Sequence, residues 1–206
     1  MVTIVDYGLG NVEALLRIFH QLGIASIRAT SSSDLLAAER VILPGVGAFD
    51  WAMQRLNASG MREQLTELVQ ERQIPLLGIC VGMQMLAQRS DEGELPGLGW
   101  VSGVVQRFDV NEAGAPLQLP HMGWNDLLVR KDHPLLEGLS EPRFYFLHSY
   151  RFVDCNPSEV LAETEYGRRF PSVVQCGNVY GVQCHPEKSH HWGLTLLKNF
   201  AGIRTC

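Results

Sequence analysis

Short apolar runs alternate with longer amphipathic stretches in the first half of the chain. Residues 2–5 are apolar and mostly β-branched, whereas after Asn11 the apolar positions recur every three or four residues until Gly23. The first pattern predicts a buried strand and the second a helix. Further strands are expected at 24–29, 40–43 and 75–79, and further helices at 34–38, 49–57, 61–72 and 82–89. Strands alternating with helices are typical of a parallel sheet with helices on both faces.

The pattern changes after about residue 98, where strand-like runs dominate. Strands are expected at 101–108, 126–129, 143–150, 160–165, 172–176 and 179–184, followed by a last helix at 192–201. Cys176-Gly177-Asn178-Val179 predicts a tight hairpin turn between two of these strands. No linker divides the chain, so we predict one α/β domain over residues 1–206. It has three layers, with a mostly parallel sheet flanked by helices and antiparallel additions in its second half.

Composition narrows the class of protein. Of the 206 residues, 46% are hydrophobic and 19% charged, which is ordinary for a globular protein. The net charge of −5 leaves no general basic surface for nucleic acid. No apolar run is long enough to cross a membrane, and the first residues lack the pattern of a signal peptide. Five irregularly spaced cysteines (Cys80, Cys155, Cys176, Cys184 and Cys206) predict no disulfide framework, and we expect a cytoplasmic protein.

The segment Gly78-Ile79-Cys80-Val81-Gly82 has the form of a nucleophile elbow, with Cys in place of Ser. It joins an expected strand to an expected helix, and its small residues permit a sharp turn. The positive end of the helix favours a thiolate at Cys80, and the Val81 N–H is placed to donate to an oxyanion. A buried, unreactive cysteine is the other interpretation, and these five residues do not decide between the two.

A candidate base follows the last expected strand. In His185-Pro186-Glu187 the proline favours an extended conformation at His185. Residues two apart in an extended segment face the same side, so Glu187 is expected to reach the imidazole. A base oriented by a carboxylate is what a thiol nucleophile requires, and parallel sheets bring the carboxyl ends of distant strands together. A surface histidine in a turn is the alternative.

Glycines provide a third candidate feature after the strand at 40–43. Gly45 and Gly47 flank Val46, which allows this backbone to approach a ligand or a peptide to turn over. The segment therefore suits a second oxyanion donor, formed by Gly45, Val46 and Gly47. It is not a dinucleotide-binding fingerprint, because Asp50 stands where G-x-G-x-x-G requires its last glycine.

The order of these motifs resembles that of triad-type glutamine amidotransferase domains. Nearly the whole chain is similar to the glutaminase subunits of imidazole glycerol phosphate synthase, an enzyme of histidine biosynthesis. The similar segments are Asp6 to Asn11, Pro44 to Phe49, the elbow, His121 to Asn125, Tyr145 to Tyr150, Gly181 to Ser189 and Gly193 to Phe200. The chain departs from the family at Val81, where Leu is usual, and at Cys184, where Phe is frequent. Strand alternation places Cys184 on the face opposite His185, so we do not expect a second nucleophile there.

The resemblance implies a role for each matching residue. Cys80 attacks the glutamine amide, His185 activates the thiol and protonates the departing ammonia, and Glu187 orients the imidazole. Glutamine is held near Gln84, Glu92, Ser149 and Tyr150. Ammonia passes to a (β/α)₈-barrel cyclase subunit, which docks against Asn11, Trp124, Asn125 and Lys188. No cofactor or metal is implied. Free glutaminase activity would waste glutamine, so the chain alone is expected to be nearly inactive, with Gly45-Val46-Gly47 as the switch.

Other interpretations stay open at this point. A related subunit could supply ammonia to a cyclase-like partner in nucleotide-sugar or surface-polysaccharide modification, and its glutaminase residues would look the same. A catalytically silent interaction subunit would not need Cys80, His185 and Glu187 intact. A freestanding cysteine hydrolase would not need the docking residues. Cys184, His185, His190 and His191 match no zinc-binding spacing.

Overall fold

An eight-stranded sheet forms the centre of the computed structural model, which describes residues 1–111 and 116–203. Its strand order is β2-β1-β3-β4-β12-β11-β10-β7. The parallel part comprises β2 (Ser26–Ala29), β1 (Val2–Val5), β3 (Val41–Gly45), β4 (Leu76–Cys80) and β12 (Val179–Val182). The antiparallel part comprises β11 (Arg168–Cys176), β10 (Val160–Tyr166) and β7 (Leu128–Val129). This mixed sheet confirms the predicted fold class.

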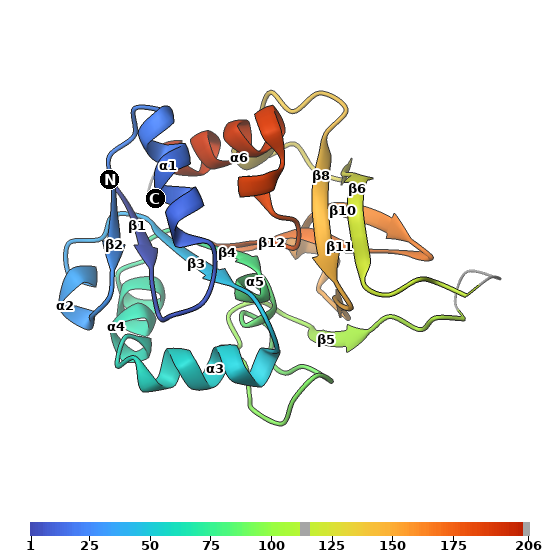
Figure 1. Cartoon of the computed structure of the whole chain (residues 1–206), viewed down its shortest axis with the longest axis horizontal. Helices are drawn as coiled ribbons and strands as arrows, with labels where there is room; N and C mark the ends of the chain where they lie inside the picture. Colours follow the sequence, from blue (N-terminus) through green and yellow to red (C-terminus); the bar gives the residue numbers. More distant parts are fainter. Residues whose placement is uncertain (112–115, 204–206) are drawn as a thin grey trace.

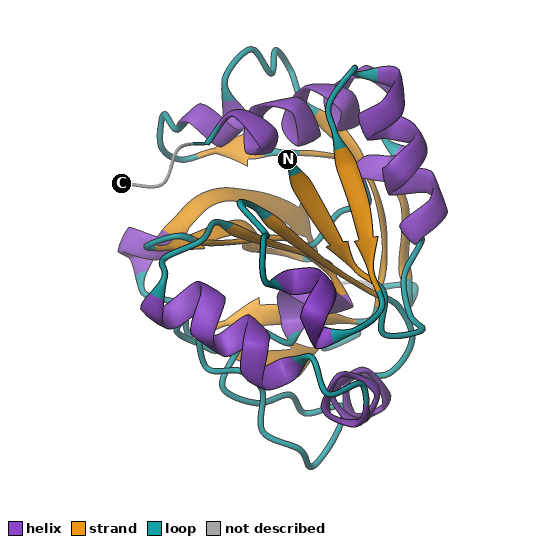
Figure 2. Ribbon diagram, turned by 90° about the vertical axis from the view of Figure 1, so that its left-hand side faces the viewer, coloured by secondary structure: helices purple, strands orange, loops and turns teal. Residues whose placement is uncertain are grey.

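Helices cover both faces of the sheet and make the outer two layers (Figures 1 and 2). On one face lie α1 (Val12–Gln21) and α6 (His190–Gly202). On the other lie α3 (Phe49–Ala58), α4 (Arg62–Thr66) and the single turn α5 (Val81–Gln84), with α2 (Ser32–Leu35) beside α4. A π-helical turn, Glu67–Glu71, continues α4. In the described part of the chain no helix is long and apolar enough to span a membrane.

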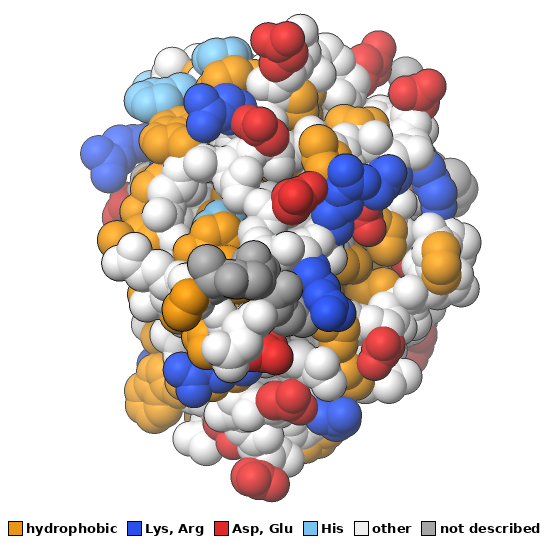
Figure 3. Space-filling model, turned by 90° about the vertical axis from the view of Figure 1, so that its right-hand side faces the viewer, with side chains coloured by type: hydrophobic (Ala, Val, Ile, Leu, Met, Phe, Trp, Pro, Cys, Tyr) orange, Lys and Arg blue, Asp and Glu red, His pale blue; other side chains and the backbone are white. Residues whose placement is uncertain are grey.

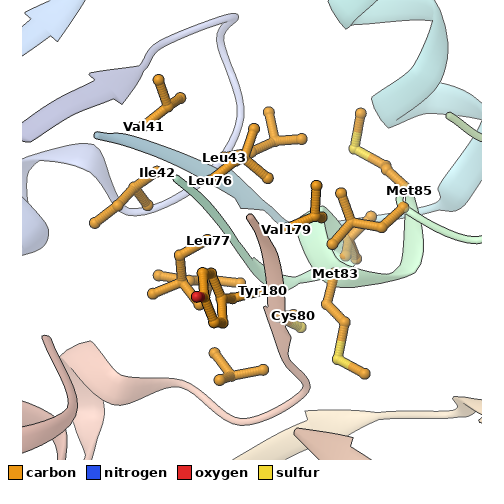
Figure 4. Close-up of a cluster of buried hydrophobic side chains, with 14 of the residues drawn as sticks. Val41, Ile42, Leu43, Leu76, Leu77, Cys80, Met83, Met85, Val179 and Tyr180 are labelled. Atoms are coloured by element: carbon orange, nitrogen blue, oxygen red, sulfur yellow. The ribbon is translucent and has the colours of Figure 1, made fainter. Parts of the chain in front are cut away.

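The core lies where β3 and β4 cross the middle of the sheet (Figure 4). Every residue of both strands is buried, as expected of strands covered on both faces. Met83 lies in α5 and Met85 directly follows it, and both pack against this cluster. Cys80 is at its edge, at the carboxyl end of β4. The apolar packing therefore fixes the backbone that carries the candidate nucleophile.

Two small antiparallel ladders stand beside the main sheet. One pairs β5 (Val104–Arg107) with β9 (Tyr150–Val153), and the other pairs β6 (His121–Asp126) with β8 (Arg143–His148). We call the second ladder the β6–β8 ribbon. Short 3-10 turns complete the second half, at Pro134–Leu136, Pro157–Glu159 and Pro186–Lys188.

Several predicted boundaries were wrong. The helix expected at 82–89 ends at Gln84, because amides of residues 97–100 bind the carbonyls of residues 85–88. Leu98 donates to Met85, and Gly99 donates to Ala87. The strand expected at 143–150 is two strands, since β8 pairs with β6 while β9 pairs with β5. β6 itself was not predicted.

Candidate active site

Cys80 lies on a sharp turn between β4 and α5, as the elbow motif predicted. Its backbone has φ 55° and ψ −113°, a left-handed conformation that costs a non-glycine residue on the order of 1–3 kcal/mol. The flanking glycines make the turn possible. A Cβ at Gly78 would lie 2.7 Å from the Gly82 oxygen, and one at Gly82 would lie 1.9 Å from the Leu43 oxygen. The local sequence therefore forces the sulfur out of the sheet.

The candidate base comes from the neighbouring strand. β12 runs parallel to β4, with Val182 opposite Ile79, so the chain that leaves β12 reaches the elbow. His185 is extended, with φ −105° and ψ 90°, as the following proline predicted. Its Nδ1 lies 2.9 Å from Glu187 Oε1, and both side chains are buried. The reason given for this contact was wrong, because the chain folds into a 3-10 turn at Pro186 and does not stay extended.

The charge of His185 is set by its two partners. Burial alone lowers the pKa of this imidazole, but hydrogen bonds with Cys80 and Glu187 and the negative charges of both raise that pKa to about 10. The imidazolium form is therefore favoured beside the sulfur. A thiolate paired with an imidazolium is the reactive form of a cysteine nucleophile.

Two backbone segments border the sulfur as candidate oxyanion donors. Val81 is the first residue of α5, and the helix itself does not pair the amides of its first turn. Val46 and Gly47 line the same cleft as Cys80. Gly47 has φ +86°, and the Val46 side chain is 39% exposed. Gly45 belongs to β3 and pairs with Cys80 in the parallel register.

A cleft of about 310 Å³ opens above the elbow. The residues expected to hold glutamine share its wall with the nucleophile and the base: Gln84, Glu92, Ser149 and Tyr150. Glu92 Oε2 accepts a hydrogen bond from the Phe49 amide at 2.9 Å, at the start of α3. Burial raises the pKa of the Glu92 carboxyl. The structure therefore brings these four residues together beside Cys80.

The orientation of Gln84 is fixed by a carbonyl. Its Nε2 donates to the Tyr150 oxygen at 3.1 Å and to Gln183 Oε1 at 3.0 Å. Both amide protons are therefore used, so only Gln84 Oε1 is left to accept a hydrogen bond from a ligand. Gln183 is a residue that the sequence analysis missed. It stands two positions before His185, and strand alternation alone could have placed both side chains on one face.

The expected docking residues lie on two sides of the triad. Trp124, in the β6–β8 ribbon, is 39% exposed and stacks on His190 at 5.1 Å. The Lys188 ammonium lies 5.6 Å from the centre of the Tyr145 ring. Figure 3 views the molecule from the side that carries the β6–β8 ribbon. Histidine, basic and hydrophobic side chains lie side by side at the upper left of this view.

Asn125 and Asn11 differ in their surroundings. Asn125 is held within the β6–β8 ribbon by His121 Nε2 at 3.2 Å, and it also donates to the Glu165 oxygen at 2.9 Å. Asn11 is exposed just before α1, and it lines a small cavity that also borders Val46 and Glu187. Asn125 therefore faces partly inward, whereas Asn11 lies behind the triad.

Cys155, Cys176 and Cys184 do not line the cleft. Cys184 is fully buried and does not line the cleft, as strand alternation predicted. Burial raises the pKa values of Cys184, Cys155 and Cys176. Cys206 is outside the described residues. In residues 1–111 and 116–203, no three His, Cys, Asp or Glu side chains are grouped to hold a metal ion.

Comparison with known proteins defines the class. The family profile named "Glutamine amidotransferase class-I" matches residues 3–202. A crystal structure described as a glutamine amidotransferase superposes with a TM-score of 0.75 at 24% identity, covering 98% of this chain and 99% of that one. The chain belongs to the class-I glutamine amidotransferase family, whose members are glutamine-hydrolysing enzymes or subunits.

Within that family the full-length similarity points to one kind of subunit. The chain is 54% identical over 204 residues to imidazole glycerol phosphate synthase subunit HisH of Bdellovibrio bacteriovorus, covering 98% of this chain and 100% of the relative. It is 44% identical over 204 residues to subunit HisH 2 of Pseudomonas aeruginosa, with the same coverage. It is thus a glutaminase subunit of the HisH type, as the resemblance in the sequence indicated.

Proposed function

We propose that this chain hydrolyses glutamine through Cys80, His185 and Glu187 and supplies the ammonia to a (β/α)₈-barrel cyclase that forms imidazole glycerol phosphate. The observation that carries the proposal is the arrangement at the elbow. A cysteine with a strained backbone neighbours an imidazole whose pKa it raises, and that imidazole contacts a buried carboxylate. The cleft beside them has room for an amino acid. The HisH relatives are subunits of imidazole glycerol phosphate synthase by name, which supports the choice of partner.

The first chemical step forms a thioester. The Cys80 sulfur attacks the side-chain carbonyl carbon of glutamine, and the negative charge moves to the carbonyl oxygen. The amides of Val81 and of the Gly45-Val46-Gly47 segment are the donors for that oxyanion. His185 gives its proton to the nitrogen, the C–N bond breaks and ammonia leaves.

The second step regenerates the enzyme. Neutral His185 takes a proton from water, and the water oxygen attacks the thioester carbon. The C–S bond then breaks, which releases glutamate and returns the thiolate. Glu187 holds the imidazole through Nδ1 in both steps, so that Nε2 faces the reacting atoms.

Residues of the cleft provide polar groups for the ammonium and the carboxylate of glutamine. Glu92 provides negative charge for the glutamine ammonium, and Gln84 Oε1 provides a second acceptor. The backbone of Ser149 and Tyr150 lies next to the substrate carboxylate. Each of these four residues lines the cleft.

Docking of the cyclase is assigned to the surface next to the cleft. Trp124 stacks on His190, and Lys188 lies over the Tyr145 ring of the ribbon. Asn125 follows Trp124 in β6, and Asn11 lines the small cavity that also borders Glu187. The proposed complex is a heterodimer in the cytoplasm. No cofactor takes part in the hydrolysis.

Replacement of Cys80 by Ala tests the proposal. The complex with the cyclase should lose glutamine-dependent product formation but retain product formation from added ammonia at high pH, because the cyclase chemistry lies in the other chain. Cys176→Ala is the matched control and should keep both activities. Glutamine-dependent turnover in the Cys80→Ala complex would reject the nucleophile. Failure of the parent complex to make imidazole glycerol phosphate from either nitrogen source would reject the partner.

A further inference from the structure

A chain of hydrogen bonds with one fixed polarity leads to the Cys80 sulfur. Gln183 Nε2 lies 3.8 Å from Cys80 Sγ, and Gln183 Oε1 accepts from Gln84 Nε2. Gln84 in turn donates to the Tyr150 carbonyl. Gln183 is fully buried and Gln84 nearly so.

The Tyr150 carbonyl decides the orientation of both glutamines. A carbonyl oxygen only accepts, so the Gln84 atom that faces it must be the amide nitrogen. The second proton of that nitrogen points at Gln183, whose facing atom must therefore be oxygen. The other end of the Gln183 amide is then an N–H group, and it points at the sulfur. A reversed Gln183 would place nitrogen against nitrogen and lose both contacts.

A buried histidine pair holds the same carbonyl from the other side. His148 Nδ1 lies 2.8 Å from the Tyr150 oxygen and therefore donates to it. In the neutral ring His148 Nε2 must accept, and His121 Nδ1 donates to it at 3.0 Å. His121 Nε2 then accepts from Asn125. Burial lowers the pKa of His121 to about 4 and that of His148 to about 3, so both rings are neutral at pH 7.

The geometry points to Gln183 as a further catalytic residue, one whose side-chain N–H stabilises the Cys80 thiolate, with Gln84, His148 and His121 as positioning residues. This inference rests on the proposed function, because it assigns Cys80 as the nucleophile. A hydrogen bond to an ion is stronger than one to a neutral group, so the N–H of Gln183 favours the thiolate over the thiol. The same sulfur lies 3.9 Å from the Leu147 carbonyl oxygen, to which a thiol S–H can donate. The titratable groups around the sulfur are Tyr7, Cys184 and His185, with Glu187 bound to His185. The same cleft is also lined by Glu92, His148, Tyr150 and Lys188.

Alkylation of Cys80 by iodoacetamide tests the inference without relying on glutamine turnover. The rate at Cys80 is followed by mass spectrometry of its peptide from pH 5 to 10, in the parent and in Gln183→Met, which keeps the length of the side chain but has no N–H. The rate at neutral pH should fall about tenfold, as expected for the loss of one charge-assisted hydrogen bond. With the cyclase added, kcat for glutamine hydrolysis should fall similarly, while KM changes less than twofold. Gln175→Met, on the neighbouring strand β11 and outside the cleft, is the control and should match the parent.

The outcomes separate the inference from the proposed function. A Gln183→Met protein that melts like the parent and alkylates at the parental rate overturns the role of Gln183. A parent complex that hydrolyses no glutamine overturns the proposed function instead. If Gln183→Met does not fold, the inference is tested in the parent protein by measuring the NMR chemical shifts of the Gln183 side-chain amide protons against pH. Their shifts should follow the pH profile of Cys80 alkylation, and shifts that stay constant through that profile overturn the inference.

Discussion

The backbones of Gly45 and Gly82 pass so closely that a Cβ at Gly45 would lie 2.4 Å from the Gly82 nitrogen. A Cβ at Gly82 would lie 1.9 Å from the oxygen of Leu43, another residue of β3. The end of β3 and the start of α5 are therefore in direct backbone contact. Of the two glycines beside Val46, Gly45 is clamped against the elbow, whereas a Cβ at Gly47 would meet nothing within 4 Å.

Gly82→Ala should destabilise the protein by about 1–3 kcal/mol or more, because the added methyl group meets backbone atoms that cannot move aside. Gly202→Ala, in α6 with open space around it, is the matched control and should be neutral or stabilise by up to about 1 kcal/mol. Urea unfolding measures both. Equal stability of the two variants would show that β3 and the elbow are not in tight contact.

Gly47→Ala should affect activity more than stability. The new side chain has space, and the cost is limited to the left-handed backbone, about 1–2 kcal/mol. If the Val46 peptide turns over to complete the oxyanion hole, the substitution should alter the balance between its two orientations. The factor by which the cyclase stimulates glutaminase activity should then change at least tenfold. The measurement is kcat with and without the cyclase. Parental stimulation in the variant, or full activity of the chain alone, contradicts a switch at this segment.

Glu187→Gln should lower the pKa of His185, because Glu187 contributes both a hydrogen bond and a negative charge to the imidazolium. Glutamine hydrolysis should fall on the order of 10⁴-fold, less than in His185→Ala, since the proposed base and nucleophile remain. NMR titration of the His185 ring measures the pKa shift, and His191→Gln serves as an exposed control. A His185 pKa that stays about 10 in Glu187→Gln would remove Glu187 from this role.

Glu92→Gln should raise KM for glutamine about tenfold with a smaller change in kcat, because the role proposed for this carboxylate is to bind the substrate ammonium and not the reacting amide. The amide oxygen of the variant can still accept from Phe49, so the start of α3 should be preserved. Glu94→Gln, exposed on the same loop, should leave both constants unchanged. An unchanged KM in Glu92→Gln returns Glu92 to a purely structural role.

Acidification should weaken the β6–β8 ribbon. The pKa values of His121 and His148 lie below the 6.5 of a free histidine, so below pH 6.5 the unfolded chain binds more protons than the folded one. Between pH 6.5 and 5 each histidine should cost on the order of 2 kcal/mol of stability. Urea unfolding at pH 7 and 5 measures the loss. It should be smaller in His148→Asn and unchanged in His191→Asn; an equal loss in all three proteins would contradict a buried neutral pair.

The sequence predicted the parts of the site that depend on local geometry. The elbow at Cys80 follows from neighbouring residues, and the parallel sheet follows from alternating apolar runs. The contact of His185 with Glu187 was expected, but from an extended backbone where the chain forms a 3-10 turn. The end of α5 could not be predicted, because amides of residues 97–100 take the carbonyls that a longer helix would use. Strand alternation could have placed Gln183 on the face of His185, but its contact with Gln84, and through Gln84 with the Tyr150 carbonyl, arises only in the folded chain.

The parallel pairing of β4 with β12 has a consequence for the growing chain on the ribosome. The strand that bears the nucleophile is made about a hundred residues before the strand that brings the base. Until β12 arrives, the fully apolar β4 has an unpaired edge, which is an aggregation hazard for any early-released fragment. Under the proposed mechanism, a chain truncated before β12 keeps Cys80 but lacks His185, and its β4 is left with an unpaired edge.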